Sequence, residues 1–327
     1  MKQNDYDTIF ASSSQFKSAI KIIRISGNKA KNVANIFNFK KPNPRIFTLK
    51  KLIFKNKVID LAPVVWLPKK RSFTGEDTYE IYIHGSIVIE KLIYNALSSY
   101  KNFRLAEPGE FTKRATLNGN IDLVQAESIN DIINTQTEKQ LTIAQSQLNG
   151  SLSKVIKGWR KEVIYLSTII ESLIDFSDED IPKDLSKLFL EKLDEIKRKI
   201  KDSINSAKLS FFIKEGFTVA IIGKPNVGKS SLINTLTKLN TSIVSDIPGT
   251  TRDLVQQKID LKGLPVVFYD TAGIRKSKNV IEKQGIELAF NIMKKSNLIL
   301  NLSDDGNFNY NYFDKNLFFN YNINLIN

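Results

Sequence analysis

Residues 223–230 read Gly-Lys-Pro-Asn-Val-Gly-Lys-Ser and fit the phosphate-loop pattern G-x-x-x-x-G-K-[ST] at every fixed position. The apolar run 217–222 precedes this segment and residues 231–236 follow it with a helical pattern, so the context is strand, loop and helix. In such a loop, backbone N–H groups and the start of the helix face phosphate oxygens. Lys229 would reach the outer phosphates, and the Ser230 hydroxyl would bind a magnesium ion. The segment therefore predicts an α/β domain that binds a nucleotide.

Two further motifs follow in the order that a nucleotide switch requires. Residues 249–253 read Gly-Thr-Thr-Arg-Asp, and a threonine there can close over the metal only when the terminal phosphate is present. Residues 270–273 read Asp-Thr-Ala-Gly and directly follow the apolar strand 264–269. An aspartate at that strand end can hold the magnesium shell, and the Gly273 N–H can meet the terminal phosphate. Together with the phosphate loop, these motifs predict a switch GTPase.

The composition is that of an ordinary globular chain. It has 327 residues, 42% hydrophobic and 25% charged, which is enough for two or three domains. Cysteine is absent from the sequence, which excludes disulfides, thiolate metal sites and cysteine nucleophiles. The polar first residues and the lack of a long apolar run favour a cytoplasmic protein without membrane contact. The net charge of +14 is compatible with a nucleic-acid partner, but a generally lysine-rich composition explains it equally well.

The amino-terminal third has the pattern of a mixed α+β domain, which we place at residues 1–118. Strands are predicted at 20–25, 64–67 and 79–84, and helical spacing occurs at 29–37 and 87–97.

Residues 119–213 are predicted to be helical, with two apolar stripes separated by a break near residue 180. The first stripe consists of Leu152, Ile156, Trp159, Val163, Leu166, Ile170 and Leu173. The second consists of Phe189, Leu193, Ile196, Ile200, Ile204, Ala207 and Phe211. They predict two long helices packed antiparallel, with a coiled-coil dimer as the alternative. The GTPase domain would then occupy residues 214–327.

The amino-terminal part of the chain contains four further segments: 24–27 (Arg-Ile-Ser-Gly), 72–77 (Ser-Phe-Thr-Gly-Glu-Asp), 108–112 (Pro-Gly-Glu-Phe-Thr) and 117–127 (Leu-Asn-Gly-Asn-Ile-Asp-Leu-Val-Gln-Ala-Glu). Taken in order, they resemble the signature of the MnmE (TrmE) family of tRNA-modification GTPases. The resemblance continues to about residue 304. Several related bacterial GTPases share the central motifs, so the amino-terminal segments are what distinguish this family from them. The resemblance implies an α+β folate-binding-like domain, the first part of a helical domain and a P-loop GTPase domain that is incomplete at its carboxyl end.

For the first domain, the resemblance implies homodimerisation and a site for formyl-tetrahydrofolate. The family's folate contacts correspond to Arg24, Glu80 and a third position that is lysine in the family and Asn120 here. That difference replaces a cation with a neutral amide, so one charge-assisted hydrogen bond to the folate would be lost.

For the GTPase domain, the resemblance implies that GTP binds with magnesium and potassium ions. Ile274 stands where many small GTPases have a water-orienting glutamine, and the family's substitute corresponds to Glu282, with Arg252 and Arg275 as auxiliary catalytic residues. The magnesium ligands would be Ser230 and Thr251, and the potassium ligands would be Asn226, Ser245, Ile247 and Thr250. The full set of implied nucleotide-binding residues is Asn226, Val227, Gly228, Lys229, Ser230, Ser231, Ser245, Asp246, Ile247, Pro248, Gly249, Thr250, Thr251, Asp270, Thr271, Ala272 and Gly273.

The family couples GTP hydrolysis to the addition of a carboxymethylaminomethyl group to the wobble uridine of certain tRNAs. It does so in a heterotetramer with the flavin-dependent protein MnmG (GidA). Two alternatives stay open: a ribosome-assembly type of GTPase, and a truncated, weakly active or non-catalytic protein that binds folate and dimerises. The second alternative is favoured by the absence of an Asn-Lys-x-Asp guanine-reading motif from the sequence.

The carboxyl-terminal residues differ from the rest of the chain. Residues 296–303 form the last recognisable strand, and residues 307–327 are rich in asparagine and aromatic residues. We therefore expect the strand at 298–302 to be an open sheet edge, with low solubility, weak guanine selectivity and little tRNA modification by this chain alone.

Overall fold

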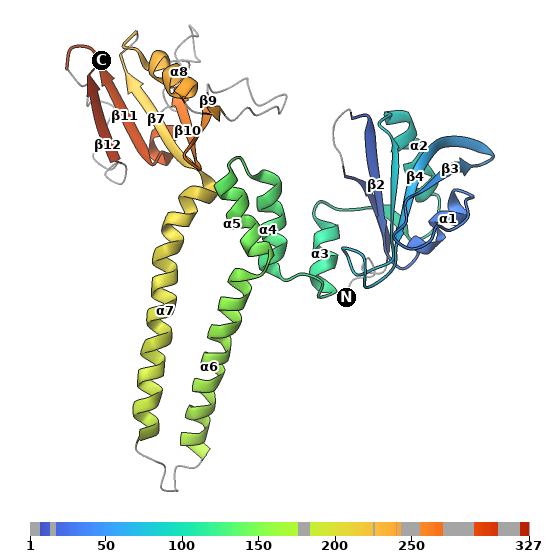
Figure 1. Ribbon diagram of the computed structural model, residues 1–327, viewed down its shortest axis with the longest axis horizontal. Coiled ribbons are helices and arrows are strands. Elements are labelled where there is room, and N and C mark those ends of the chain that lie inside the picture. Colours follow the sequence, from blue (N-terminus) through green and yellow to red (C-terminus); the bar gives the residue numbers. More distant parts are fainter. Residues whose placement is uncertain are drawn as a thin grey trace. The chain divides into compact units, whose positions relative to one another are not determined.

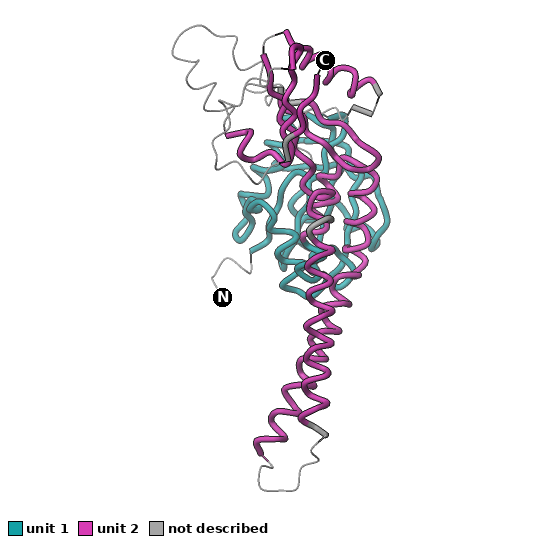
Figure 2. The backbone as a smooth tube through the Cα atoms, turned by 90° about the vertical axis from the view of Figure 1, so that its left-hand side faces the viewer, with its two compact units in different colours: residues 1–126 teal, residues 127–327 magenta. Residues whose placement is uncertain are grey.

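The computed structural model describes residues 7–13, 18–175, 184–224, 226–239, 241–242, 256–270, 291–306 and 321–326 (Figure 1). The chain divides into two compact units, Met1–Ala126 and Glu127–Asn327, which Figure 2 distinguishes by colour. The domain boundaries at residues 118 and 213 that the sequence favours stay predictions.

The first unit is built on a six-stranded sheet. Its strands are β1 (Thr8–Ser12), β2 (Ile20–Ser26), β3 (Thr48–Phe54), β4 (Lys57–Leu67), β5 (Thr78–His84) and β6 (Phe103–Leu105), in the order β3-β4-β5-β2-β1-β6. All neighbours are antiparallel except β1 and β6. The helices are η2 (Ala30–Asn32), α1 (Val33–Ile36), α2 (Ile87–Ser98) and α3 (Glu110–Leu117).

Alternation along the central strands separates the core of this unit from its candidate site. Ile23 and Ile25 of β2 and Ile81 of β5 are buried in one cluster with Ile93 and Leu97 of α2. The residues between them point to the other face of the sheet, because successive strand side chains alternate. The β2–β5 register places Arg24 directly opposite Glu80.

Four helices follow: α4 (Leu123–Asn134), which crosses the boundary between the two units, and α5 (Glu138–Leu148), α6 (Ser151–Asp175) and α7 (Asp184–Glu215) in the second unit. Helices α6 and α7 lie side by side (Figure 1), with the Lys199 ammonium 3.0 Å from the Glu162 carboxylate.

The predicted stripe on α6 is only partly correct. Leu166 is buried, but Ile170 is 42% exposed while its neighbour Ile169 is 5% exposed. Other stripe members with large exposed fractions are Leu152, Ile156 and Val163. The apolar surface of α6 is wider than one neighbour can cover, and the stripe by itself does not determine which side α7 occupies.

The second sheet contains β7 (Phe217–Gly223), β8 (Thr241–Ser242), β9 (Gln256–Leu261), β10 (Leu264–Asp270), β11 (Leu298–Ser303) and β12 (Tyr321–Ile326), in the order β12-β11-β7-β10-β9-β8. Strands β12, β11, β7 and β10 are parallel. Helix α8 (Lys229–Leu239) contributes Ile233 to the core on one face of this sheet, and Ile292 and Met293 pack on the other face. Among the described helices, none combines the length and the apolar character that a membrane crossing requires.

The expectation of an open edge at residues 298–302 is wrong. Strand β12 pairs with β11 along its whole length, from Leu298 opposite Tyr321 to Ser303 opposite Ile326. The physical reason lies in residues 321–325, where aromatic or apolar side chains alternate with asparagine, which is the period of a strand. The tendency of the tail to form β structure is therefore used within its own sheet.

Candidate functional site

The phosphate loop joins the end of β7 to the start of α8. Gly223, Asn226 and Gly228 have φ angles of +148°, +63° and +91°, a region in which glycine is the least strained residue. A Cβ atom on Gly223 would lie 2.4 Å from the Leu302 carbonyl oxygen, so this position accepts only glycine without movement of the backbone. The glycines of the pattern thus allow the loop to turn tightly against β11.

Lys229 is 4% exposed although it carries a charge. Its ammonium donates hydrogen bonds to the carbonyl oxygen of Gly223, at 2.9 Å, and to that of Lys224. The cation therefore lies within the curve of the loop, where phosphate oxygens could take the place of these carbonyls. Asn226, Ser230 and Ser231 are exposed, while Val227 is buried in the core beneath the loop.

Neighbouring strands end beside this loop. The β10–β7 register places the backbone of Asp270 opposite Ile221, two residues before Gly223. After β11, the Asp305 carboxylate lies 2.8 Å from the Lys224 ammonium and accepts a 2.7 Å hydrogen bond from the Ser303 hydroxyl. Ligands of open α/β sheets bind at the carboxyl ends of the strands, and the phosphate loop lies at that edge.

The remaining predicted nucleotide, metal and catalytic residues lie outside the described residues. They are Ser245, Asp246, Ile247, Pro248, Gly249, Thr250, Thr251, Arg252, Thr271, Ala272, Gly273, Arg275 and Glu282. Within the described part of the chain, no three His, Asp or Glu side chains gather in a way that could hold a metal ion. The roles of these residues stay predictions.

In the first unit, the predicted folate residues Arg24 and Glu80 form an ion pair. The Arg24 Nε donates to Glu80 Oε1 at 2.8 Å, and the Tyr82 hydroxyl donates to Glu80 Oε2 at 2.9 Å. The Arg24 guanidinium carbon lies 5.9 Å from the ring centre of Phe73 and 5.7 Å from that of Phe111. Within the described residues, neither Nη group of Arg24 has a hydrogen-bond acceptor. The site therefore presents two free Nη donor groups beside two phenyl rings.

Asn120 lies close to this site, and its side-chain amide binds the backbone of the neighbouring residues 72 and 73. Its Nδ2 group donates to the carbonyl oxygens of Ser72 and Phe73, each at 3.0 Å. Asn118 donates in the same way to the Thr74 carbonyl oxygen, at 2.7 Å. These two amides hold the segment that carries Phe73.

A network of buried charges beside the site was missed by sequence reasoning. Arg114 is 7% exposed, and its guanidinium lies 2.9 Å from Glu110 and 3.2 Å from Glu76. Arg104 contributes a second guanidinium 2.7 Å from Glu110. Because α3 carries Phe111 and residues 72–77 carry Phe73, the pair of Arg114 with Glu76 links the two elements that flank Arg24. In the sequence, the opposite charges of Glu110 and Arg114, four residues apart, were the pattern from which part of this network could have been predicted.

This network changes the acidity of Glu110. Burial alone raises the pKa of its carboxyl, but hydrogen bonds from Arg104, the Glu107 N–H and Arg114 outweigh burial and lower the pKa to about 2. Glu110 therefore stays ionised in the folded protein well below its ordinary range.

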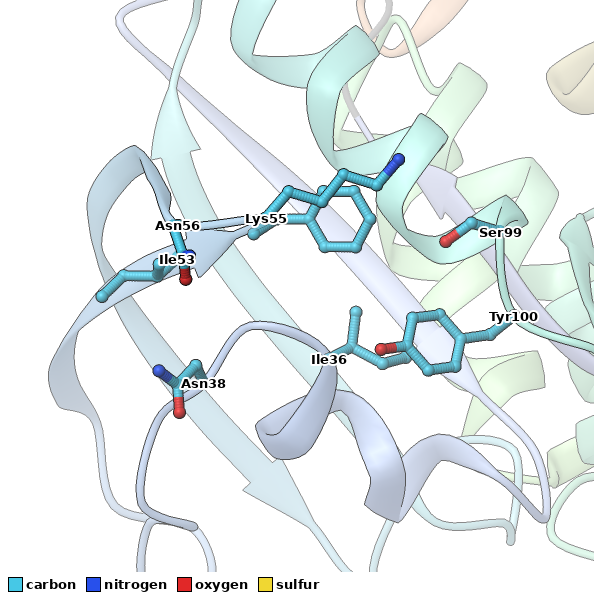
Figure 3. Close-up of a pocket in the computed structure, with 8 residues that line it drawn as sticks. Ile36, Asn38, Ile53, Lys55, Asn56, Ser99 and Tyr100 are labelled. Atoms are coloured by element: carbon cyan, nitrogen blue, oxygen red, sulfur yellow. The ribbon is translucent and has the colours of Figure 1, made fainter.

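A cavity of about 490 Å³ lies elsewhere in the first unit, between α1, the β3–β4 turn and the end of α2 (Figure 3). It is lined by Ile36, Asn38, Ile53, Phe54, Lys55, Asn56, Ser99 and Tyr100. None of the predicted site residues lines this cavity, so it is separate from both candidate sites.

The second unit carries a phosphate loop on a largely parallel sheet. This combination places the chain in the class of P-loop nucleotide-binding proteins with an α/β domain. The family model described as the GTP-binding protein TrmE N-terminus matches residues 8–120, and the MnmE helical domain model matches residues 123–306. The chain belongs to the MnmE (TrmE) family. The family and the three-part fold predicted from the sequence are confirmed.

Two relatives illustrate the similarity, and both are described as tRNA modification GTPase MnmE. The protein of Pelagibacter ubique is 42% identical over 290 residues, which cover 88% of this chain and 66% of the relative. The protein of Rickettsia prowazekii is 41% identical over 303 residues, which cover 91% of this chain and 68% of the relative. The chain thus spans about two thirds of their length. A crystal structure of Era from Aquifex aeolicus is 32% identical, covers 33% of this chain and 39% of its own, and has a TM-score of 0.24.

Proposed function

We propose that this chain hydrolyses GTP in the cytoplasm and that hydrolysis serves the modification of tRNA at the wobble uridine. The observation that carries the proposal is the buried Lys229 ammonium within a phosphate loop, in a chain whose relatives are described as tRNA modification GTPases. The group added would be carboxymethylaminomethyl, and the partner would be the flavoprotein MnmG, in a heterotetramer with a homodimer of this chain.

The residues of this chain would divide the work at the nucleotide. Lys229 would hold the outer phosphates, and Ser230 and Thr251 would hold the magnesium ion, with Asp270 in its outer shell. Glu282 would orient the attacking water, because Ile274 has no hydrogen-bonding group, and Arg252 and Arg275 would assist. Bound GTP supplies the phosphoanhydride bond that is broken. Asn226, Ser245, Ile247 and Thr250 would hold a potassium ion that offsets negative charge in the transition state.

We expect hydrolysis of GTP to be faster in potassium than in sodium by roughly an order of magnitude or more, since the ion takes the place of an arginine finger. The measurement is phosphate release at equal ionic strength in the two salts. Asn226→Gly is the matched variant, because glycine accepts the φ of +63° and only the amide is lost. It should bind nucleotide but lose most of the difference between the salts. Equal wild-type rates in both salts would exclude the potassium role.

The first unit supports a proposal of folate binding. The free Nη groups of Arg24, held by Glu80 and flanked by Phe73 and Phe111, suit a planar ligand that carries hydrogen-bond acceptors. We propose formyl-tetrahydrofolate as that ligand and the same unit as the homodimer contact. Asn120 would act by holding the Phe73 segment.

Arg24→Ala is expected to weaken formyl-tetrahydrofolate binding by roughly tenfold to a hundredfold, because hydrogen bonds from a charged donor are lost. Isothermal titration calorimetry on the full chain measures the effect. Arg45→Ala is the control, since Arg45 is exposed and, among the described residues, its guanidinium donates only to the Arg71 carbonyl oxygen. An unchanged affinity in Arg24→Ala would separate this residue from the ligand.

A second candidate function rests on the first unit alone, where the Arg24–Glu80 ion pair between Phe73 and Phe111 would hold a folate. In that case the chain would bind folate and dimerise without hydrolysing GTP. Folate binding in the absence of any hydrolysis or nucleotide preference would favour it over the GTPase proposal.

A further inference from the structure

One part of the chain carries most of its net charge. Residues 40–71, here called the basic hairpin, comprise strands β3 and β4 with their flanks. They contain ten lysines and arginines and one aspartate, a net charge of +9, whereas the other 295 residues share the remaining +5 of the total +14. The cations are Lys40, Lys41, Arg45, Lys50, Lys51, Lys55, Lys57, Lys69, Lys70 and Arg71. A general lysine bias would spread the charge along the chain, so it does not account for this concentration.

The charge of the basic hairpin is not neutralised within the described part of the chain. Nine of the ten cationic side chains are exposed, Lys50 is half-buried, and none of the ten forms an ion pair with a described residue. The single acid, Asp60, is 8% exposed and accepts hydrogen bonds from the backbone N–H groups of Leu61 and His84 and pairs with the His84 ring. Strand β3 is the outer strand of its sheet, so the hairpin lies at an edge (Figure 1).

The two flanks of the hairpin meet around an aromatic residue. The Arg45 N–H donates to the Trp66 carbonyl oxygen at 2.8 Å, and the Arg45 guanidinium donates to the Arg71 carbonyl oxygen at 2.9 Å. The Lys41 ammonium lies 3.2 Å from the centre of the Trp66 ring. Phe47, between the first flank and β3, is 59% exposed. One exposed aromatic side chain, Phe47, and the half-buried Trp66 therefore lie among these cations.

We propose that the basic hairpin binds the phosphate backbone of RNA, with tRNA as the occupant. Unpaired lysines and arginines bind phosphates through release of counterions, and aromatic side chains near them can stack on unpaired bases. The choice of tRNA among polyanions rests on the proposed function. None of the ten cations belongs to the phosphate loop or is among the residues that contact the Arg24 side chain, so the hairpin can be substituted without changing either set of residues.

The test compares two variants with the same loss of charge. The hairpin variant carries Lys51→Gln, Lys57→Gln, Lys69→Gln and Arg71→Gln, all exposed side chains that take part in no hydrogen bond or ion pair with a described residue. The control carries Lys187→Gln, Lys197→Gln, Arg198→Gln and Lys201→Gln on the exposed surface of α7. Affinity for an unmodified tRNA transcript is measured by fluorescence anisotropy at several salt concentrations. Nucleotide binding and circular dichroism are recorded on the same preparations.

We expect the hairpin variant to bind tRNA at least tenfold more weakly and to reduce the slope of log affinity against log salt by up to about 3, since each phosphate contact contributes roughly 0.7 to 0.9. The control should stay within about twofold of the wild type. Equal weakening in both variants would overturn the proposal, because binding would then follow total charge. Stronger hairpin-dependent binding to phosphatidylglycerol vesicles than to tRNA would also overturn it. If the wild-type protein binds tRNA through the hairpin but does not bind nucleotide, that result would contradict the GTPase proposal and leave the hairpin proposal in place.

Discussion

Replacement of Lys229 with alanine is expected to weaken GTP binding by roughly a hundredfold or more. Loss of one partner from a buried, charge-assisted contact costs about 2–5 kcal/mol, and each 1.4 kcal/mol is a factor of ten in affinity. Lys229 fits this description because it is 4% exposed and its ammonium lies within the phosphate loop. The measurement is the Kd of a fluorescent GTP analogue by titration.

Lys224→Ala is the matched control, since it removes a lysine from the same loop. The Lys224 ammonium forms an exposed ion pair with Asp305, and such pairs contribute about 1 kcal/mol or less. We therefore expect its Kd to change by less than about fivefold. If the two variants bind the nucleotide equally well, Lys229 does not contact phosphate.

Replacement of Arg114 with methionine is expected to lower the free energy of unfolding of the first unit by about 3–5 kcal/mol, because the Glu76 carboxylate loses its arginine and the Glu110 carboxylate loses one of two. The side chains of Arg114, Glu110 and Glu76 are 8%, 9% and 16% exposed. Urea unfolding followed by the fluorescence of Trp66, in a Trp159→Phe background, reports on this unit. Arg45→Met is the control at an exposed position and should cost under about 1 kcal/mol. A loss in Arg114→Met no greater than in this control would contradict the prediction.

The same network predicts a dependence on pH. The pKa of Glu110 is lowered in the folded protein to about 2 from an ordinary 4.5, so its stabilising contribution is complete above pH 4.5 and is lost as pH falls toward 2. The contribution is on the order of 3 kcal/mol. The difference in unfolding free energy between the wild type and Glu110→Gln should therefore shrink between pH 5 and pH 3. A constant difference over this range would show that the carboxylate charge is not responsible.

The parts of the candidate sites that could be predicted from the sequence are those that lie within one short segment. The phosphate loop extends over eight residues, and its glycines are required by local backbone angles such as the φ of +148° at Gly223. Arg24 and Glu80 were identified through the family signature. Their pairing also agrees with simple alternation, because both point away from the apolar face of their strands.

The surroundings of Arg24 could not be derived in this way. Phe73 and Phe111 flank its guanidinium, yet they come from a loop and a helix far apart in the chain. The link between Arg114 and Glu76 that holds these elements spans 38 residues. Such contacts depend on how separate segments pack, and no local pattern records them.

By itself, the amino-acid sequence determined the phosphate loop, the family and the concentration of positive charge at residues 40–71, because each depends on residue type and spacing along the chain. Only the tertiary structure decided that β12 covers β11, that Ile169 rather than Ile170 is buried on α6, and that two arginines surround Glu110. An alternating or amphipathic pattern specifies that a face will be buried, but the register and the packing between distant segments select its partner.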